Sequence, residues 1–392
     1  MVWALAPWLC FALPSVGVVY KYLGGAGALS YLAATLALFV WLQRDGSRWA
    51  RQSLDRVPPI TSGLAAAAVI ALFVAVHPYA DETERGGSDR NEALNVAANS
   101  LLDGEFPYNS RTYLGNPISP MPGAVLLATP FVLLGDSAFQ NVFWLAVAAA
   151  FLYVHASRAG RMVVPAVLGL SPLVVHEYVT GGDLLANSLY ILCFVLGLLG
   201  ASTLTAGQAR GRMVLCSVLL GIGLSSRANF ALLLPLIGAS MVNRAGWRQG
   251  LLSMGIVLAT AGAVTIPFYL HDPAAFTPLQ TWRVLNQSGA TLPVQVGIPA
   301  VAFSLSLYLA VDRHIDRTEV FLRCATAVLA LPFIALTAVA VIQRGMDGLA
   351  LAGYGLPAVI FAAAAWCATH LRLSEDEPGV RDRLFGAAHE AA

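Results

Sequence analysis

A segment rich in carboxylates, residues 78–121, holds most of the side chains in this sequence that could carry out chemistry. A carboxylate within hydrogen-bond reach of a hydroxyl can act as a general base, which accelerates a reaction by about 10²–10⁴-fold. Carboxylates also bind Mg²⁺ or Mn²⁺, but no spacing here requires a metal ion, so a divalent cation is an option and no cofactor is demanded. The seven acids of the segment are Asp81, Glu82, Glu84, Asp89, Glu92, Asp103 and Glu105.

Asp89 is the first candidate for the base. It precedes an amphipathic helix that we expect to run to about residue 103. Asp is also a favoured N-cap residue, and Glu92 stands three residues later, as in a capping box. Asp89 can therefore cap the helix, act as the base, or do both. Asp81 and Glu82 are the second candidates, with a solvated charge run at the end of a span as the alternative.

Three arginines are candidates for binding a phosphate group, because the positive-inside rule disfavours them on the outer side where we expect them. They are Arg227, Arg283 and Arg111. Arg227 lies between two apolar runs, where an unpaired cation costs about 2.5–3.5 kcal/mol at mid-membrane. It therefore needs an anionic partner or a place at the interface, where the side chain can snorkel to water.

Asp183 is the main acid between the later apolar runs. It lies at the mouth of two of them, where it can pair with Arg227, bind sugar hydroxyls, or only terminate a helix. Glu177 lies shortly before it. We expect Asp183, Glu92 and Tyr108 to contact a sugar or an acceptor.

Membrane-spanning helices must position these side chains. The chain has 392 residues, of which 57% are hydrophobic and 11% charged, whereas a soluble domain has about 25% charged residues. The apolar runs are continuous, unlike the alternating strands of a membrane β-barrel. A net charge of +1 gives no attraction for nucleic acid. We therefore expect an all-α polytopic protein in a lipid bilayer.

Apolar runs predict about 12 transmembrane helices. The spans are, approximately, 2–20, 24–43, 58–77, 138–156, 162–178, 185–201, 213–226, 229–242, 250–269, 292–311, 320–341 and 349–369. A further run, from Pro122 to Gly135, has about 14 residues and covers roughly 21 Å, short of the ~30 Å hydrocarbon core. We expect it to form a re-entrant or interfacial helix.

Arginine placement decides the predicted orientation. If the run from Pro122 does not cross, 16 basic residues lie in the cytoplasm and seven outside, as the positive-inside rule requires. Both termini are then cytoplasmic. We divide the chain into residues 1–77 (three spans), 78–137 (one long outer loop with interfacial helices), 138–370 (about nine spans) and 371–392 (a tail expected to be disordered).

Four short stretches resemble the GT-C class of integral-membrane glycosyltransferases. They are the AAxxLLxGxxPY pattern of 97–108, the PxPG sequence of 120–123, the Gly-Gly-Asp of 181–183 and SSRANFALLLP at 225–235. The resemblance, closest to mannosyl- and arabinosyltransferases, implies inverting transfer of a sugar from a polyprenyl-phosphate donor. The acceptor would be a cell-envelope glycan, glycolipid or protein on the outer face of a bacterial inner membrane. Asp89, or the pair Asp81 and Glu82, would lie near the acceptor hydroxyl.

Two other functional classes fit a chain with many spans. A secondary transporter is one, although transporters of this size usually have two similar halves and ionisable groups near mid-membrane. A polymerase, ligase or flippase of lipid-linked glycans is the nearer alternative, because it handles the same kind of donor.

Overall fold

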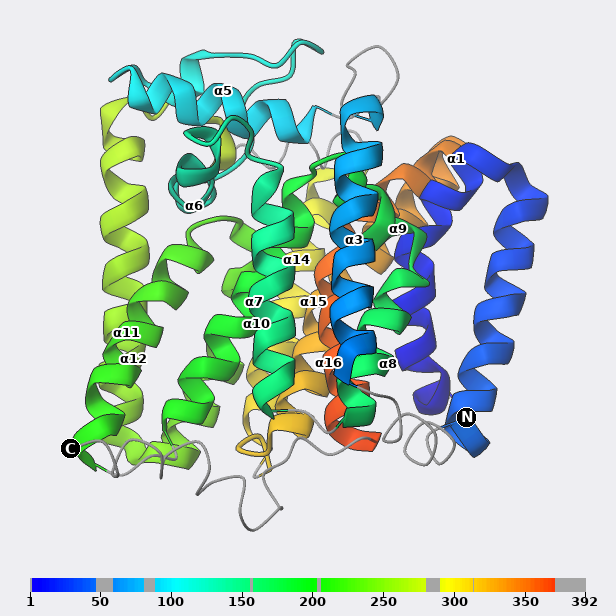
Figure 1. Ribbon diagram of the computed structural model, residues 1–392. Coiled ribbons are helices and arrows are strands. Elements are labelled where there is room, and N and C mark those ends of the chain that lie inside the picture. Colours follow the sequence, from blue (N-terminus) through cyan, green and yellow to red (C-terminus); the bar gives the residue numbers. More distant parts are fainter. Residues whose placement is uncertain are drawn as a thin grey trace.

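The computed structural model describes residues 2–46, 59–80, 89–155, 158–202, 206–279, 290–312 and 314–370. Over these ranges the chain is helical apart from short connections and one isolated bridge between Arg111 and Pro117. Most helices run side by side as a bundle, and one short helix lies across an end of it (Figure 1). The predicted tail, residues 371–392, lies outside the described residues.

Eleven helices form the bundle within the described ranges. They are α1 (Val2–Trp41), α3 (Pro59–Ala80), α7 (Phe139–His155), α8 (Arg158–Gly169), α9 (Pro172–Val179), α10 (Asp183–Ala201), α11 (Ala206–Leu224), α12 (Leu234–His271), α14 (Leu292–Ala310), α15 (Thr318–Arg344) and α16 (Leu356–His370). At one end lie α5 (Arg90–Leu102) and α6 (Pro122–Val132).

Two of the longest helices are interrupted at a glycine. Gly24 in α1 and Gly246 in α12 have φ angles of 65° and 81°, in the left-handed region that glycine adopts without steric cost. Across the first interruption, the Trp8 Nε1 atom donates a hydrogen bond of 3.1 Å to Thr35 Oγ1. The two parts of α1 therefore fold back on each other as a hairpin (Figure 1).

Among the described residues, five helical stretches are long and apolar enough to cross a membrane, or six if a pair bent by 80° counts as one span. This confirms a helical membrane protein, but not the predicted count of twelve spans. Part of the difference arises because three of these stretches each contain two predicted spans. In addition, α7 has 17 residues, fewer than the roughly 20 that a crossing requires. The five stretches are Pro7–Arg44, Asp183–Ala201, Ala228–His271, Leu292–Ala310 and Thr318–Thr369.

Helix α10 lies at the centre of the bundle. It contacts α7, α9, α11 and α16, and most of its residues are buried. Its first residue, Asp183, is completely buried, so the bundle core begins at a charged side chain.

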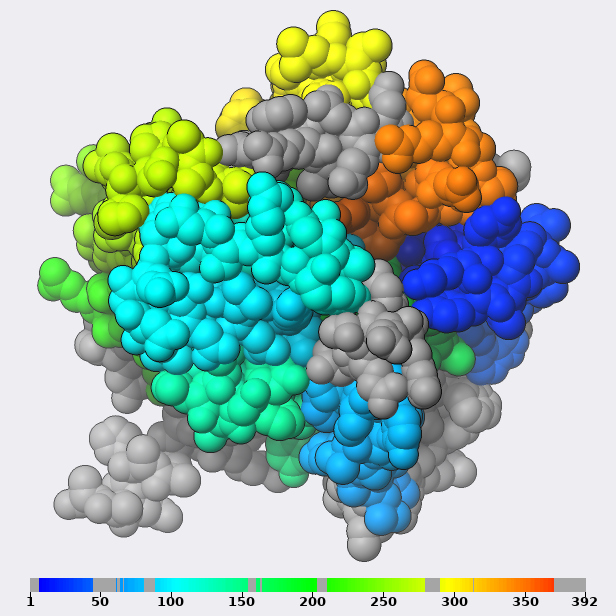
Figure 2. All heavy atoms as spheres, turned by 90° about the horizontal axis from the view of Figure 1, so that it is seen from above, coloured from blue at the N-terminus to red at the C-terminus, as the bar shows by residue number. Residues whose placement is uncertain are grey.

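Helix α5 agrees closely with the sequence prediction. It ends at Leu102, and Gly104 follows with a φ of 77°. Leu102, the last residue of the helix, is 46% exposed. Figure 2 shows α5 and the residues after it, in cyan, over one part of the end face of the molecule. The face of α5 that packs against α6 consists of Ala93, Leu94, Ala97 and Ala98.

Helix α6 is 11 residues long, which fits the predicted helix too short to cross. Pro122 stands in its first turn, where a missing N–H costs nothing. The Gly123 nitrogen donates a hydrogen bond of 2.9 Å to the Ser225 carbonyl. A Cβ atom at Gly123 would lie 2.2 Å from the Ile222 carbonyl oxygen, so only glycine allows this approach. The PxPG sequence thus seats α6 on the end of α11.

Candidate functional site

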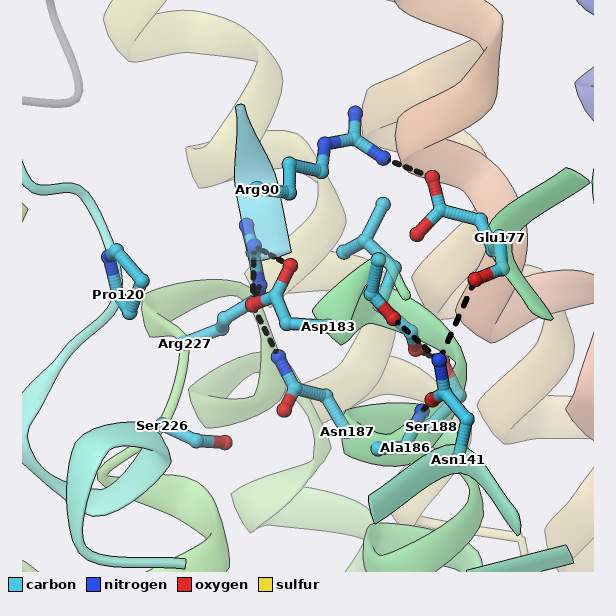
Figure 3. A network of polar contacts seen from close by, with 12 residues as sticks. Arg90, Pro120, Asn141, Glu177, Asp183, Ala186, Asn187, Ser188, Ser226 and Arg227 are labelled. Carbon is cyan, nitrogen blue, oxygen red and sulfur yellow. Dashed lines mark hydrogen bonds and ion pairs between the residues drawn. The ribbon is translucent and has the colours of Figure 1, made fainter. Parts of the chain in front are cut away.

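Asp183 and Arg227 form a buried ion pair at the end of the bundle that α5 covers. Asp183 begins α10, and Arg227 lies in the link between α11 and a short 3-10 helix, η3 (Ala228–Leu233). The Arg227 Nη2 atom lies 2.6 Å from Oδ1 and 2.5 Å from Oδ2 of Asp183, and Nε lies 3.1 Å from Oδ2 (Figure 3). The Asp183 side chain is 0% exposed and that of Arg227 is 16% exposed. Arg227 therefore has the anionic partner that its position required.

Two further side chains orient this pair. Asn187 Nδ2 donates a hydrogen bond of 2.8 Å to Asp183 Oδ2, and the Tyr190 hydroxyl donates one of 2.6 Å to Asn187 Oδ1. All three residues lie in α10, and the carboxylate also stands at its positive N-terminal end. Asn187 and the N-terminus of α10 thus both stabilise the negative charge of Asp183. The Asp183 carboxylate in turn holds the Arg227 guanidinium in one orientation.

A second ion pair joins α5 to α9. Arg90, the first residue of α5, donates from Nη1 to Oε1 of Glu177, which is 2% exposed (Figure 3). The Arg90 guanidinium also lies 4.8 Å from the ring centroid of Tyr354, in the 3-10 segment η5 (Gly345–Gly355). Burial acts to lower the pKa of Arg90, but Glu177, Tyr354 and Asp183 together raise it above its usual range. Arg90 is thus held as a cation.

The Glu177 carboxylate is only half satisfied. Its Oε2 atom is buried and has no hydrogen-bond partner among the described residues. A Cβ atom at Gly182 would lie 2.2 Å from this oxygen, so a side chain there would displace the Glu177 carboxylate. Gly181, with a φ of 71°, makes the turn into α10. The close approach at Gly182 and the left-handed backbone at Gly181 explain why two glycines precede Asp183.

Asn141, in α7, fixes the turn between α9 and α10. Its Oδ1 atom accepts a hydrogen bond of 3.1 Å from the Ala186 nitrogen. Its Nδ2 atom donates to the carbonyl oxygens of Glu177 and Gly182, at 3.3 and 3.0 Å. The two acids of the ion pairs, Glu177 and Asp183, therefore lie on a turn whose backbone Asn141 holds in place.

The structure gives Asp89 and Glu92 partners outside their own helix. The Asp89 Oδ2 atom accepts hydrogen bonds from Thr112 Oγ1, at 2.6 Å, and Asn116 Nδ2, at 2.8 Å. Glu92 Oε2 accepts one of 2.7 Å from the Tyr113 nitrogen. Asp89 stands at the N-cap position of α5 but makes no side-chain bond to the helix, so its carboxylate does not play the capping role. Ser88, the other capping candidate, lies outside the described residues. Both carboxylates instead hold the loop at 112–116, and Asp89 keeps part of its surface exposed.

Tyr108 and Arg111 take part in local contacts. Tyr108 is 3% exposed, packs edge-on against Phe106 and Phe276, and donates a hydrogen bond of 3.1 Å from its hydroxyl to the Pro120 carbonyl. Arg111 is exposed and donates one of 3.0 Å to the Gly115 carbonyl in its own loop. No contact of the described chain joins either residue to the two ion pairs.

The other predicted site residues, Asp81, Glu82 and Arg283, lie outside the described residues. Arg90 was not predicted as a site residue, and Glu177 was noted only as an acid near Asp183. Two signals could have identified them. Arg90 is a basic residue on the outer side, which the positive-inside rule disfavours, and Glu177 is an acid inside an apolar run.

Asp136, just before α7, forms a further polar cluster. Its carboxylate accepts hydrogen bonds from Asn95 Nδ2, at 3.2 Å, and from Asn91 Nδ2, at 3.4 Å, and lies 3.5 Å from His77 Nε2. Burial acts to raise the pKa of Asp136, but the contacts with His77, Ala138 and the two asparagines lower it below its usual value. The charged carboxylate thus ties α5 to the ends of α3 and α7.

Within the described part of the chain, no group of three or more His, Cys, Asp or Glu side chains is arranged to hold a metal ion. Comparison with known proteins gives no relative, since no protein-family model, curated protein or solved structure matches the chain significantly.

Proposed function

We propose that the protein is a membrane glycosyltransferase. It would move a sugar from a polyprenyl-phosphate donor to a cell-envelope glycan, glycolipid or protein on the outer face of a bacterial inner membrane. The observation that carries this proposal is the buried Asp183–Arg227 pair at the end of the bundle where α10 contacts α5. A positioned cation at that place suits a phosphate at the membrane interface. The proposal includes about twelve crossings, with both termini in the cytoplasm.

Arg227 would bind the phosphate that leaves with the lipid. Its Nη1 atom makes no hydrogen bond within the described residues, and 16% of the side chain is exposed. A preoriented cation stabilises charge that develops on a leaving group, and it does so most strongly where water is excluded. Asp183 and Asn187 would keep the guanidinium in position for this role.

Asp89 would act as the base. Its carboxylate is oriented by Thr112 and Asn116, and the neighbouring Arg90 reaches the buried ion pairs. The acceptor oxygen would bond to the anomeric carbon as the bond from that carbon to the phosphate oxygen breaks, and the hydroxyl proton would pass to Asp89. Attack opposite the leaving phosphate inverts the anomeric centre. Asp81 and Glu82 are the alternatives for this role.

The buried charges also favour a second candidate, a coupled transporter, because ionisable groups inside a helical bundle often mark an ion pathway. Its expected activity is proton- or sodium-coupled uptake into proteoliposomes. A polymerase, ligase or flippase of lipid-linked glycans would use the same donor, but would join or move whole oligosaccharides.

The test is transfer of radiolabelled sugar from polyprenyl-phosphate donors by purified protein in nanodiscs. Asp89→Asn should lower the rate about 10²–10⁴-fold, whereas Asp81→Asn and Glu82→Gln should change it little. Asp103→Asn is the matched control, because Asp103 is an exposed acid of the same segment. Transfer that survives Asp89→Asn, Asp81→Asn and Glu82→Gln overturns the proposed base. Ion-coupled uptake without transfer from any donor supports the transporter instead.

A further inference from the structure

A lateral groove of about 560 Å³ opens between α1, α3, α8 and α9. Helix α9 lies between α1 and α3 and contacts both (Figure 1). The volume falls within the range of about 300–1,000 Å³ that small-molecule sites occupy. Its lining is mostly apolar and includes Val18, Ala80, Leu170 and Val175. This composition suits a hydrocarbon chain better than a sugar.

The mouth of the groove carries exposed aromatic and apolar side chains. Tyr22 is 58% exposed, Tyr79 is 67% exposed and Leu170 is 51% exposed. Tyr22 and Tyr79 lie just beyond the predicted spans 2–20 and 58–77, and tyrosines are enriched where a helix leaves the hydrocarbon core. A lipid chain can therefore enter the groove directly from the membrane.

One cation, Lys21, lies near a wall of the groove. His176 lines the groove, and its Nδ1 atom is buried with no hydrogen-bond partner among the described residues. The His176 ring lies 6.2 Å from that of Tyr22, and the Lys21 Nζ atom lies 5.2 Å from the Tyr22 centroid. An anionic head group would find complementary charge here.

We propose that this groove is a holding site for the spent carrier, a polyprenyl monophosphate, with its phosphate against Lys21 and His176. The choice of lipid rests on the proposed function. One groove accepts one chain, whereas a diacyl phospholipid has two. His176 and Thr180 are the polar residues of the lining besides two tyrosines, so the groove offers few partners for a sugar.

The charge of the product also fits this site. Transfer converts a phosphate diester into a monoester, which gains a second ionisation with a pKa of about 6 and carries more negative charge at pH 7. The holding site differs from the reaction position at Arg227, because no residue that lines the groove belongs to α10, α11 or η3. Spent carrier could thus leave Arg227 and remain bound until it returns to the bilayer.

The test is equilibrium binding of radiolabelled polyprenyl monophosphate to the full chain in nanodiscs of zwitterionic lipid. Gly169 lines the groove, and a Cβ atom there meets nothing within 4 Å, so Gly169→Trp should fill it. We expect binding at least tenfold weaker. Gly255→Trp, on α12, is the matched control, because a Cβ atom at Gly255 also meets nothing within 4 Å. It should bind as the unaltered chain does.

Two further measurements test the head group and guard against misfolding of the tryptophan variant. Lys21→Met should weaken monophosphate binding about fivefold and leave polyprenol binding unchanged, since one interfacial cation contributes about 1 kcal/mol. Gly169→Cys should react with a maleimide, and the monophosphate should protect it.

Each outcome decides a separate point. Binding that Gly169→Trp does not weaken, or equal binding of polyprenol, overturns the holding site and leaves the proposed transferase standing. Displacement by phosphatidylglycerol at equal concentration also overturns the choice of a single-chain lipid. Groove-dependent binding with no sugar transfer from any donor overturns the transferase alone.

Discussion

Asp183 and Arg227 lie 44 residues apart and meet through two nitrogens of the guanidinium and both carboxylate oxygens. The contact joins the start of the central helix α10 to the link between α11 and η3. Any change to one partner therefore affects both the local structure and the proposed phosphate site.

Removal of one partner should destabilise the protein strongly. Asp183→Asn leaves the Arg227 charge without its counter-ion, at a cost of about 3–5 kcal/mol in the free energy of unfolding. The double variant Asp183→Leu with Arg227→Met should recover most of this stability, because two apolar side chains need no counter-ion. Unfolding in detergent micelles checks the stability, and a double variant that regains sugar transfer as well would contradict the role of Arg227.

Arg90 should hold α5 on the bundle. Arg90→Gln leaves Glu177 buried without a counter-ion and removes the contact with Tyr354, so the amide hydrogens of α5 should exchange faster. Glu105→Gln is the control, because Glu105 is exposed and follows the same helix. Equal hydrogen exchange in α5 for the two variants would show that the ion pair does not dock this helix.

Gly123 should tolerate no side chain. Gly123→Ala would place its Cβ atom 2.2 Å from the Ile222 carbonyl oxygen, so α6 must shift, at a cost of about 1–3 kcal/mol. At Gly255 the same substitution meets open space and should be neutral or slightly stabilising. Thermal unfolding of the two variants gives the comparison, and equal midpoints would refute the close contact.

Asp136 should make stability fall in acid. Folding lowers the pKa of Asp136 from its usual value of 3.8. The charged carboxylate therefore contributes its full stabilisation above pH 3.8, and this stabilisation is lost as the pH falls through the lower pKa of the folded state. His77, Asn91, Asn95 and the Ala138 nitrogen are the groups that face it. Asp136→Asn should lose stability near neutral pH and lack this part of the acid dependence. Thermal unfolding between pH 6 and 3 measures the difference, and parallel curves for the two proteins would contradict it.

The predicted orientation can be read by cysteine labelling in whole cells. A membrane-impermeant maleimide should label Asn99→Cys in α5 from outside, and should label Trp247→Cys only after permeabilisation. Background should be low, because four of the five natural cysteines are buried and the fifth is partly buried. Labelling of Asn99→Cys from the cytoplasmic side would remove the basis for transfer on the outer face.

Local features of this chain were predictable because their causes are local. Composition alone indicates a helical membrane protein. Helix α5 follows from its apolar face and the glycine after it, and α6 from a run too short to cross. The need of Arg227 for an anion follows from the cost of an unpaired charge among apolar residues.

Contacts between distant segments depended on the fold. Asp89 stands in a capping position, yet its side chain binds a loop that returns from residues 112 and 116, and this alternative cannot be seen in a linear pattern. Arg90 meets Glu177, 87 residues later, because α5 crosses the bundle end where α9 terminates. Periodicity and spacing describe neighbours within a helix, whereas the pairing of buried charges depends on how the helices pack, and only the packed structure brought these two pairs together.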